Sequence, residues 1–471
     1  MTRSPFALVL LFAAPLAVAQ LPPVRLTVEP AAEPKPALRY ELLPSARERV
    51  SGNAALHYAK AMLARPPIDK AKGPEEEKKL VAWEEADLVK LPVGDVKKHL
   101  QGYATSFREL EHGTRCKTCE WDTAPASGPA ALDQAVATQT PLRELARMLS
   151  LRVRVELAEK RYDDAVASIR TGLQYGKHVG EGPTLIQMLV GHALVAVFLK
   201  RAEDLSACPG AQSLYWGLAT LPRPLIDPRP GLDGEDELNE SFLPGLADLR
   251  RGPVTAEKAL DVAETALKVY AAGSDEPNPL MAFGGRVAIS GHAAVHHDEA
   301  KKDLLARGWD KKTVNAMPAV QAVFLNSFES YRELADDHRK WFLTPFPEAF
   351  EGFPKATAKL KKAQKERQGD TLFQTFLMVL PAVEKVHQAG ARTERRIAAM
   401  RAIEAVRVHT EAAAGLPKEL ADIKKVPVPL DPLTGKVFVY TTTADGFTLS
   451  SPDSESVPKA LAVSYEVKVR R

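Results

Sequence analysis

The sequence predicts a mainly α-helical protein, an array of packed helical hairpins with a small C-terminal antiparallel β-sheet. Between residues 41 and 414, apolar residues recur at spacings of three and four, the period of an amphipathic helix. After residue 414 the pattern changes to short alternating stretches that are typical of strands. Hydrophobic residues make up 45% of the chain and charged residues 26%, so the chain can bury a large globular core.

These patterns divide the chain into four parts. Residues 1–19 are interpreted as a signal peptide and residues 20–40 as a proline-rich linker. Residues 41–414 form the predicted helical domain. Residues 415–471 form a small β module, which we expect to pack on a helix over 391–413.

The first residues have the features of a secretory signal. Arg3 supplies a positive start, residues 6–18 are apolar but too short to span a bilayer, and residues 17–19 are a small-residue cleavage signal. We therefore expect a mature chain that begins at Gln20, without a transmembrane segment, in the periplasm or outside the cell. The competing interpretation, an uncleaved N-terminal anchor, is disfavoured by Pro15 and by the short apolar run.

The charge balance argues against one class of partner. The chain has 63 Lys and Arg and 60 Asp and Glu, a formal net charge of +3, and removal of Arg3 with the signal lowers it by one to +2. A chain so close to neutral offers no basic surplus to a phosphate backbone. We therefore expect no nucleic-acid partner.

The centre of the predicted fold is a helical hairpin over residues 141–176. Pro141 suits the first position of a helix, and a stripe of apolar residues follows at helical spacing. Tyr162 opens a second helix, with Asp163 and Asp164 in its first turn, where carboxylates favour the helix dipole. The short turn between them makes the pair an antiparallel hairpin. The apolar stripe of the first helix consists of Leu142, Ala146, Leu149, Val153 and Leu157.

A third, almost wholly apolar helix is expected over residues 185–199. It is shorter than the roughly 20 residues that span a bilayer, so we interpret it as a buried core helix. Gly191 would allow a neighbouring helix to approach closely. His192 is interpreted as a hydrogen-bonded core histidine, with a ligand role as the alternative.

Further helices follow from the same periodicity, and Gly308 and Asp310 are placed to stop one helix and cap the next. Residues 342–354, with three prolines and four phenylalanines, are interpreted as a packed loop. The remaining helices are expected over residues 53–63, 95–111, 255–271, 288–306, 314–331 with a possible extension to 342, 371–380 and 391–413.

Strands are predicted at the C-terminal end. Residues 437–442 and 447–450 are strand-like and are joined through Asp445 and Gly446, a hairpin signal. Residues 465–469 alternate between apolar and polar side chains and are expected to form a third strand.

Cys116 and Cys119 form a C-x-x-C pair, with His112 four residues before Cys116. In an oxidising compartment a local disulfide is the first interpretation. A metal site with His112 would need a fourth ligand that the sequence does not indicate. A thioredoxin-like motif lacks its βαβ setting, and haem attachment lacks its His because Glu120 follows. Cys208 leaves the number odd, so it pairs with one of the others or remains a buried thiol.

The richest group of potential metal ligands is His292, His296, His297, Asp298 and Glu299. On a continuous helix, His292 and His296 lie one turn apart on one face and could hold a metal between them. A zincin would need Glu at position 293, where this chain has Ala, although Glu299 could supply a carboxylate. The alternative is a solvated polar face.

Several stretches resemble known families. Ala158 with residues 162–165 resembles one tetratricopeptide-repeat unit, although the sequence has no second copy at the period of about 34 residues. The C-terminal module is similar to that of type II secretion pseudopilins. Most of the mature chain resembles uncharacterised secreted proteins of planctomycete bacteria, which implies export and a shared fold without an activity. The stretches that carry this resemblance are residues 163–165, 180–185, 308–309, 316–318, 394–396, 416–417, 431–435, 437–440 and 446–447.

No catalytic motif selects an activity. The sequence contains no G-x-S-x-G, phosphate-binding loop or dinucleotide fingerprint, and we expect no cofactor. The first hypothesis is an exported protein that binds or scaffolds a protein partner through helical grooves. The alternatives are a metal-dependent hydrolase that uses His292 and His296, and an accessory factor of an envelope secretion system, which the C-terminal module suggests.

Overall fold

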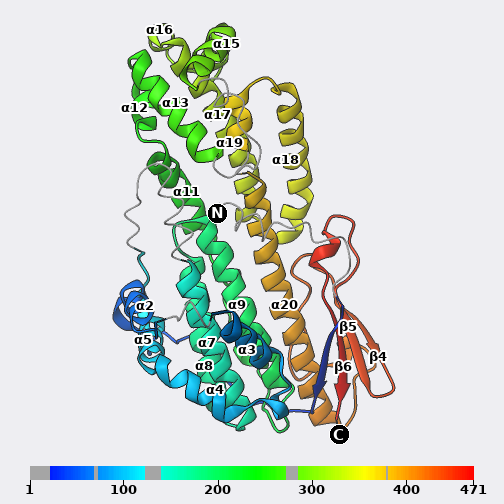
Figure 1. Cartoon of the computed structure of the whole chain (residues 1–471). Helices are drawn as coiled ribbons and strands as arrows, with labels where there is room; N and C mark the ends of the chain where they lie inside the picture. The colour runs from blue at the N-terminus through cyan, green and yellow to red at the C-terminus, as the bar shows by residue number, and fades with distance from the viewer. Residues whose placement is uncertain (1–21, 68–72, 122–138, 272–284, 378–379, 471) are drawn as a thin grey trace.

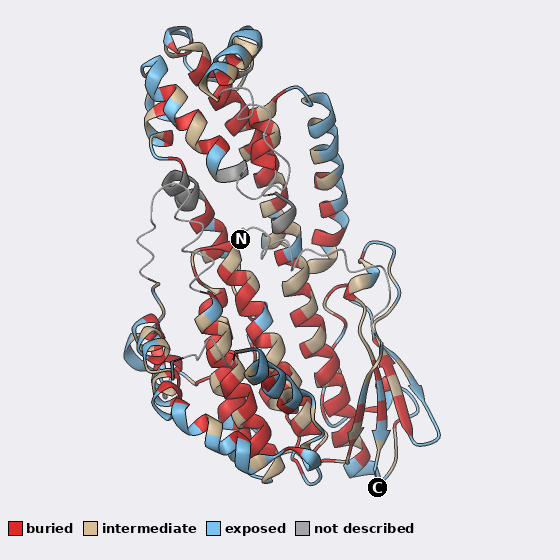
Figure 2. Cartoon of the chain, viewed as in Figure 1, coloured by how far each residue is buried: buried red, intermediate tan, exposed pale blue. Residues whose placement is uncertain are grey.

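The computed structural model describes residues 22–67, 73–121, 139–271, 285–377 and 380–470. Figure 1 shows an elongated molecule in which the long helix α20 (Leu380–Ala413) runs from an upper group of helices down beside a lower group, with a β-sheet beside its C-terminal half. Helices dominate and the sheet is small, so the predicted fold class is confirmed. Figure 2 shows that the helix faces turned toward one another are buried. The predicted signal peptide lies outside the described residues.

The N-terminal helices pack beside the central bundle. Asn53 caps α2, because its Oδ1 accepts a hydrogen bond from the Ala55 N–H at 3.0 Å. The helix expected over 95–111 is divided by a 3-10 segment over residues 101–103, and Pro66 packs against Gly102, where an added Cβ would lie 2.8 Å from Pro66 Cγ. The elements are β2 (Val50–Asn53), α2 (Ala54–Leu63), α3 (Gly73–Glu85), η1 (Leu88–Lys90), α4 (Val93–Leu100), η2 (Gln101–Tyr103), α5 (Ala104–Thr114) and β3 (Cys116–Thr118).

The three central helices form where the sequence places them, as α7 (Gln139–Ala158), α8 (Tyr162–Gly180) and α9 (Leu185–Ser206). In the α7–α8 turn, Lys160 adopts a φ of 59°, and the next N–H, that of Arg161, donates to Glu156 O at 2.8 Å, as in a Schellman turn. Helices α8 and α9 approach closely at Gly191, where an added Cβ would lie 2.2 Å from Gly180 Cα. The predicted hairpin and close approach are thus confirmed.

Helix α9 is longer than expected. It extends over 22 residues, and among the described residues it is the one helix whose length and apolar composition would suffice to cross a membrane. However, 67% of its apolar window is buried against other parts of the protein, with α8, α7 and α20 as neighbours. The interpretation as a core helix agrees with this burial.

A second group of helices lies at the other end of α20. Gly308 ends α15 with a φ of 87°, and Asp310 caps α16 by accepting from the Thr313 N–H at 2.8 Å, as predicted. The helix expected over 314–331 is divided, because the residue before Pro318 is pushed out of the helical region. The elements of this group are α11 (Arg229–Phe242), α12 (Leu246–Arg251), α13 (Ala256–Ala271), α15 (Arg286–Ala306), α16 (Lys311–Ala316), α17 (Ala319–Arg339), η3 (Lys340–Leu343), α18 (Phe346–Glu366) and α19 (Thr371–Leu377). The short helix α10 (Tyr215–Ala219) packs instead on the C-terminal half of α20, in the same core as the sheet.

The packed loop expected over 342–354 is wrong in its second half, because the chain is helical from Phe346 onward as α18. Two of the prolines, Pro345 and Pro347, fall before and within the first helical turn, where no backbone N–H is needed. The density of prolines therefore gave a false loop signal. The last helix is also longer than the predicted 391–413, since α20 begins at Leu380.

The C-terminal sheet has four strands in the order β1-β6-β5-β4. The strands β4 (Val439–Thr442), β5 (Gly446–Ser450) and β6 (Ser464–Val469) pair antiparallel as predicted, with η4 (Leu420–Asp422) and η5 (Lys459–Leu461) in the connections. The linker prediction is wrong over Val24–Val28, because these residues form β1 and pair parallel with β6. Leu26 and Val28 are buried in the sheet core. The sheet is therefore mixed, and one strand from the start of the described chain joins three strands from its end.

A buried ion pair fastens the β module to α20. The guanidinium of Arg395 donates to both carboxylate oxygens of Asp431 at 2.9 and 2.7 Å, and the two side chains are 2% and 0% exposed. The same guanidinium donates to Leu461 O at 2.9 Å. Charges this deep are stable only when they are paired and hydrogen-bonded. The contact therefore fixes where the loop before β6 lies against α20.

A second ion pair joins α20 to α9, and a third lies within α20 itself. Arg396 donates to both oxygens of Glu203 on α9 at 2.8 Å, and Tyr465 of β6 donates to the same carboxylate at 2.9 Å. About three turns further along α20, Arg407 donates to Glu404 of the same helix at 2.8 Å, and both side chains are 1% exposed. The same guanidinium donates to Glu29 O and Ala211 O at 2.9 Å, which connects α20 to two other segments. The helix thus packs against α9 and the sheet through paired charges as well as apolar contacts.

We expect Asp431→Asn to lower the free energy of unfolding by about 3–5 kcal/mol, because it leaves the Arg395 guanidinium buried without its carboxylate. Urea denaturation followed by circular dichroism measures the change. The double variant Arg395→Met with Asp431→Leu should recover most of the loss. Asp445→Asn, which removes an exposed pair with Lys468, serves as the control and should change the stability far less. If Asp431→Asn lowered the free energy of unfolding no more than the control does, the Arg395–Asp431 pair would not stabilise the fold.

Candidate functional site

Helix α15 brings the two predicted metal ligands together, with the ring centroids of His292 and His296 4.4 Å apart. His292 Nε2 also lies 3.4 Å from Asp370 Oδ1, at the start of α19. His297 Nδ1 lies 3.4 Å from the adjacent Asp298, whose side chain is fully exposed. The structure therefore adds a buried carboxylate, which the sequence did not single out, to the predicted pair.

The Asp370 carboxylate already has several protein partners. It accepts hydrogen bonds from Ser327 Oγ at 2.8 Å, from the Phe373 N–H at 3.0 Å and from the Arg367 guanidinium. Burial opposes ionisation, but His292 and these partners hold the pKa of Asp370 at about 2. Across the part of the chain that the structure describes, no group of three or more His, Cys, Asp or Glu side chains is arranged to hold a metal. The His292–His296 metal site stays a prediction.

The structure has Cys116, Cys119 and Cys208 in the thiol form, with Cys116 and Cys208 buried. Cys116 Sγ lies 3.5 Å from the backbone oxygen of His112, and Cys119 Sγ lies 3.9 Å from the backbone oxygen of His178. Burial raises the pKa of all three thiols. The pKa of Cys208 rises to about 11 and that of Cys119 to about 12. All three therefore carry their protons at neutral pH and are poor nucleophiles. The Cys116–Cys119 disulfide stays a prediction.

His192 lies between α9 and α20, as expected of a core histidine. Its Nδ1 is 3.2 Å from Thr393 Oγ1, and its side chain is buried. Burial lowers the pKa of His192 to about 4, so the ring is neutral at physiological pH. It is a hydrogen-bonded core residue.

A second buried histidine, His387 on α20, was not singled out by the sequence analysis. Four phenylalanine rings surround it, with centroid distances of 5.1 Å to Phe342, 5.2 Å to Phe346, 5.4 Å to Phe350 and 4.4 Å to Phe353. Burial lowers its pKa to about 4. Its Nδ1 is buried and has no hydrogen-bond partner among the described residues. A neutral, polar atom therefore lies inside an aromatic box.

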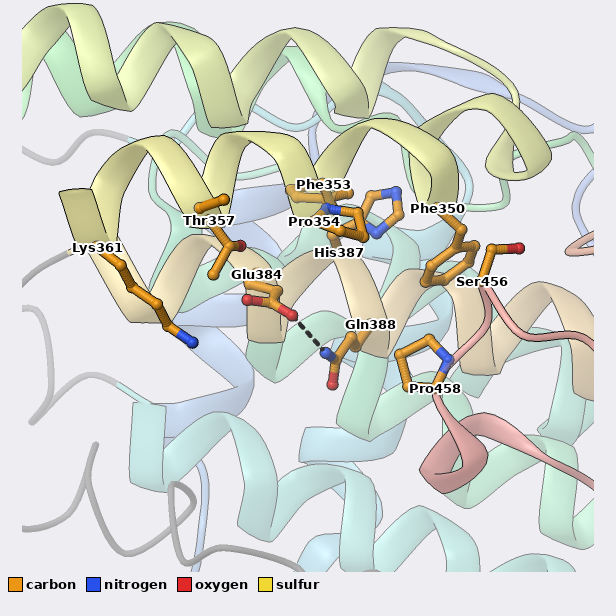
Figure 3. Close-up of a pocket in the computed structure, with 11 residues that line it drawn as sticks. Phe350, Phe353, Pro354, Thr357, Lys361, Glu384, His387, Gln388, Ser456 and Pro458 are labelled. Carbon is orange, nitrogen blue, oxygen red and sulfur yellow. Dashed lines mark hydrogen bonds between the residues drawn. The ribbon is translucent and has the colours of Figure 1, made fainter.

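This box forms one wall of a hollow of about 370 Å³ between α18, α20 and the loop before β6 (Figure 3). Helix α18 contributes the apolar side chains of Phe350, Phe353 and Pro354. Phe350 also belongs to a small separate core that contains Leu461 and other buried residues of the C-terminal module. The wall of the hollow is therefore built from elements that lie far apart in the sequence.

Polar groups surround the apolar wall. Gln388 Nε2 donates to the Glu384 carboxylate at 3.1 Å on α20, and Ser456 and Pro458 contribute from the loop. Lys361 lies at the end nearest the C-terminus of α18. The hollow thus combines an aromatic wall with a few polar groups, the usual composition of a ligand site.

A second hollow, of about 460 Å³, continues along α18 from the first. Lys361 lines both hollows, and Lys365 and three glutamines complete the second. Lysine is the only type of charged residue in its lining. We call the two hollows together the α18 groove.

The groove was not predicted from the sequence, because residues 342–354 were expected to form a loop. A signal was present, since residues 353, 357, 361 and 365 follow one another at a spacing of four. This series puts Phe353, Thr357, Lys361 and Lys365 on one face of a helix, apolar at one end and basic at the other. The partner surfaces on α20 and the C-terminal loop could not be foreseen from this pattern.

Comparisons of the chain with protein-family models, with curated proteins and with solved structures find no match. The resemblance to secreted planctomycete proteins therefore remains an expectation. The function has to be inferred from the geometry of the groove.

Near the groove, α20 also carries a buried carboxyl group with an unusual pKa. Glu394 accepts a hydrogen bond from the Leu225 N–H at 2.7 Å. Burial raises the pKa of Glu394 to about 7, although this hydrogen bond and the charge of Arg223 oppose the shift. In the unfolded chain the same group titrates near pH 4.5.

We expect this group to make the protein less stable as the pH rises from about 4.5 to about 7. In that interval only the folded state retains the proton, so each increment of pH lowers the free energy of unfolding. The shift corresponds to roughly 3 kcal/mol above pH 7. Glu394→Gln keeps an acceptor for the Leu225 N–H and removes the titration.

Glu394→Gln should therefore equal the wild type in stability at pH 4.5 and exceed it by roughly 3 kcal/mol at pH 8. The buried histidines titrate in both proteins, so their effect cancels in the difference between the two curves. The measurement is urea unfolding at several pH values, with Glu466→Gln at the exposed pair with Arg25 as the control. A difference that does not vary with pH would show that Glu394 titrates normally.

Proposed function

We propose that the protein is an exported helical protein that binds or scaffolds a protein partner, and that the α18 groove is the binding site. The observation that carries the proposal is the aromatic hollow of about 370 Å³ between α18, α20 and the C-terminal loop. Ligand pockets of proteins typically have volumes of roughly 300–1,000 Å³ and a mostly apolar lining with a few placed polar groups.

The chemistry of the groove favours binding over catalysis. The His387 ring is held neutral among phenylalanine rings, and its pKa of about 4 is too low for a general base at neutral pH. The Glu384 carboxylate is engaged by Gln388. The remaining charged groups of the lining are lysines, which suit recognition of an anion.

The proposal of export rests on the sequence of the first residues. The positive start, the short apolar run and the small-residue cleavage signal support a mature chain beginning at Gln20. A periplasmic or secreted protein would meet its partner outside the cytoplasm.

Photo-crosslinking in the native host tests the proposed site. A benzophenone amino acid in place of Ala358, an exposed residue lining the hollow, should form one covalent adduct of defined mass with a protein partner. The same amino acid in place of Val295, which is 78% exposed on α15, is the matched control and should form none. An absence of adducts at 358, or the same adducts at both positions, would contradict the proposal. Mass spectrometry of the exported protein also reveals where the mature chain begins.

A metal-dependent hydrolase that uses His292 and His296 is the second candidate. The observation that favours it is the 4.4 Å separation of the two rings beside the Asp370 carboxylate. Against it, Asp370 already accepts hydrogen bonds from Ser327 and Phe373.

Native mass spectrometry of protein purified without chelator separates the two candidates. We expect no stoichiometric zinc, because the Asp370 carboxylate is already satisfied by protein groups. One zinc per chain that is lost in His296→Ala and kept in the neighbouring control Val295→Ala would favour the hydrolase instead. Because position 295 is exposed, the control leaves the helix and its packing unchanged.

A further inference from the structure

The second half of α18 is strongly basic. Residues 355–365 contain five lysines and no acidic residue. Lys359 and Lys362 pair with carboxylates, at Asp337 and Glu366 respectively. Lys361 and Lys365, in contrast, are exposed and form no ion pair with any other described residue. Both of these lysines line the α18 groove, whereas Lys355, which also has no ion pair among the described residues, lies outside its lining.

The groove is therefore polarised along its length. Its first hollow offers the rings of Phe350 and Phe353, and the buried Nδ1 of His387 lies in the same wall without a partner. Its second hollow offers only ammonium groups and glutamine amides. A ligand that fills both hollows must carry an aromatic group with a polar atom at one end and negative charge at the other.

We infer that the α18 groove binds an acidic peptide segment of the partner, anchored in the first hollow by a Trp or Tyr side chain. This inference rests on the proposed binding function and specifies the chemistry of the partner. Trp and Tyr join a large apolar ring to one hydrogen-bonding group, which fits an aromatic wall that contains one polar nitrogen. Asp or Glu residues on one side of the anchor lie along Lys361 and Lys365.

The polarity of the groove restricts where the acidic residues stand. The Glu384 carboxylate lines the first hollow, so a peptide carboxylate there meets a like charge. A peptide with negative charge on only one side of its aromatic anchor can pair with the lysines of the second hollow and keep its carboxylates away from Glu384 in the first. A peptide with acidic residues on both sides should bind more weakly than one with acidic residues on the favoured side.

The experiment is fluorescence anisotropy with labelled peptides and the mature chain. Two acidic peptides each contain one Trp, with four Glu on its N-terminal side in the first and on its C-terminal side in the second. Two basic peptides have the same sequences with Lys in place of Glu. A further peptide carries Ala in place of Trp. One acidic peptide should bind at least about tenfold more tightly than its Lys counterpart, and added salt should weaken it. The Ala peptide should lose most of the affinity.

Variants assign the binding to the groove. Lys361→Glu with Lys365→Glu should weaken the acidic peptide at least about tenfold, whereas Lys362→Glu, on the same helix but outside both hollows, should change it by less than about twofold. Ala358→Trp should block the first hollow. All these positions are exposed, so circular dichroism should show unchanged folding.

The outcomes distinguish a failure of the acidic-peptide inference from a failure of the proposed binding function. Acidic peptides that bind no better than basic ones, together with a specific adduct at position 358, would overturn the peptide chemistry and leave the binding function. Peptide binding that survives Ala358→Trp would overturn the groove as the site. If no peptide binds and no adduct forms, both the inference and the proposed function are wrong.

Discussion

The architecture depends on the pairing of charges that are buried along α20. Arg395 and Arg407 are buried and Arg396 is partly exposed, and each of the three pairs with a buried carboxylate. An arginine left without its partner at such a depth would destabilise the fold by several kcal/mol. Arg396 and Arg395 have partners in different regions, Glu203 on α9 and Asp431 in the C-terminal module, whereas Arg407 pairs with Glu404 of α20 itself. Only an arrangement that brings both regions to α20 satisfies all of these charges.

The same pairing determines the shape of the candidate site. The Arg395 guanidinium that binds Asp431 also binds Leu461 O, at the end of the loop that lines the groove. Phe350 packs from α18 onto Leu461 and the rest of this small core. The three walls of the groove are thus held relative to one another by buried contacts. A groove of this kind is largely formed before a ligand arrives, which lowers the entropic cost of binding.

The sequence was sufficient wherever a signal was local. The α7–α8 hairpin, the stop at Gly308, the cap at Asp310 and the β4–β5 hairpin were all predicted from residues within a few positions of one another. It misled where proline density competed with helical periodicity, as at the start of α18. Of the candidate site, the closeness of His292 and His296 followed from their spacing. The aromatic box around His387 did not.

The sequence by itself determined the helical class of the protein, most of its helices and the C-terminal hairpin, because periodicity and turn chemistry act over a few residues. Only the tertiary structure decided that residues 24–28 complete the sheet against β6, and that α18, α20 and the loop before β6 meet at one groove. Both depend on contacts between residues far apart in the chain. Such contacts are selected by the burial of apolar surface and the pairing of buried charges, which no local pattern encodes.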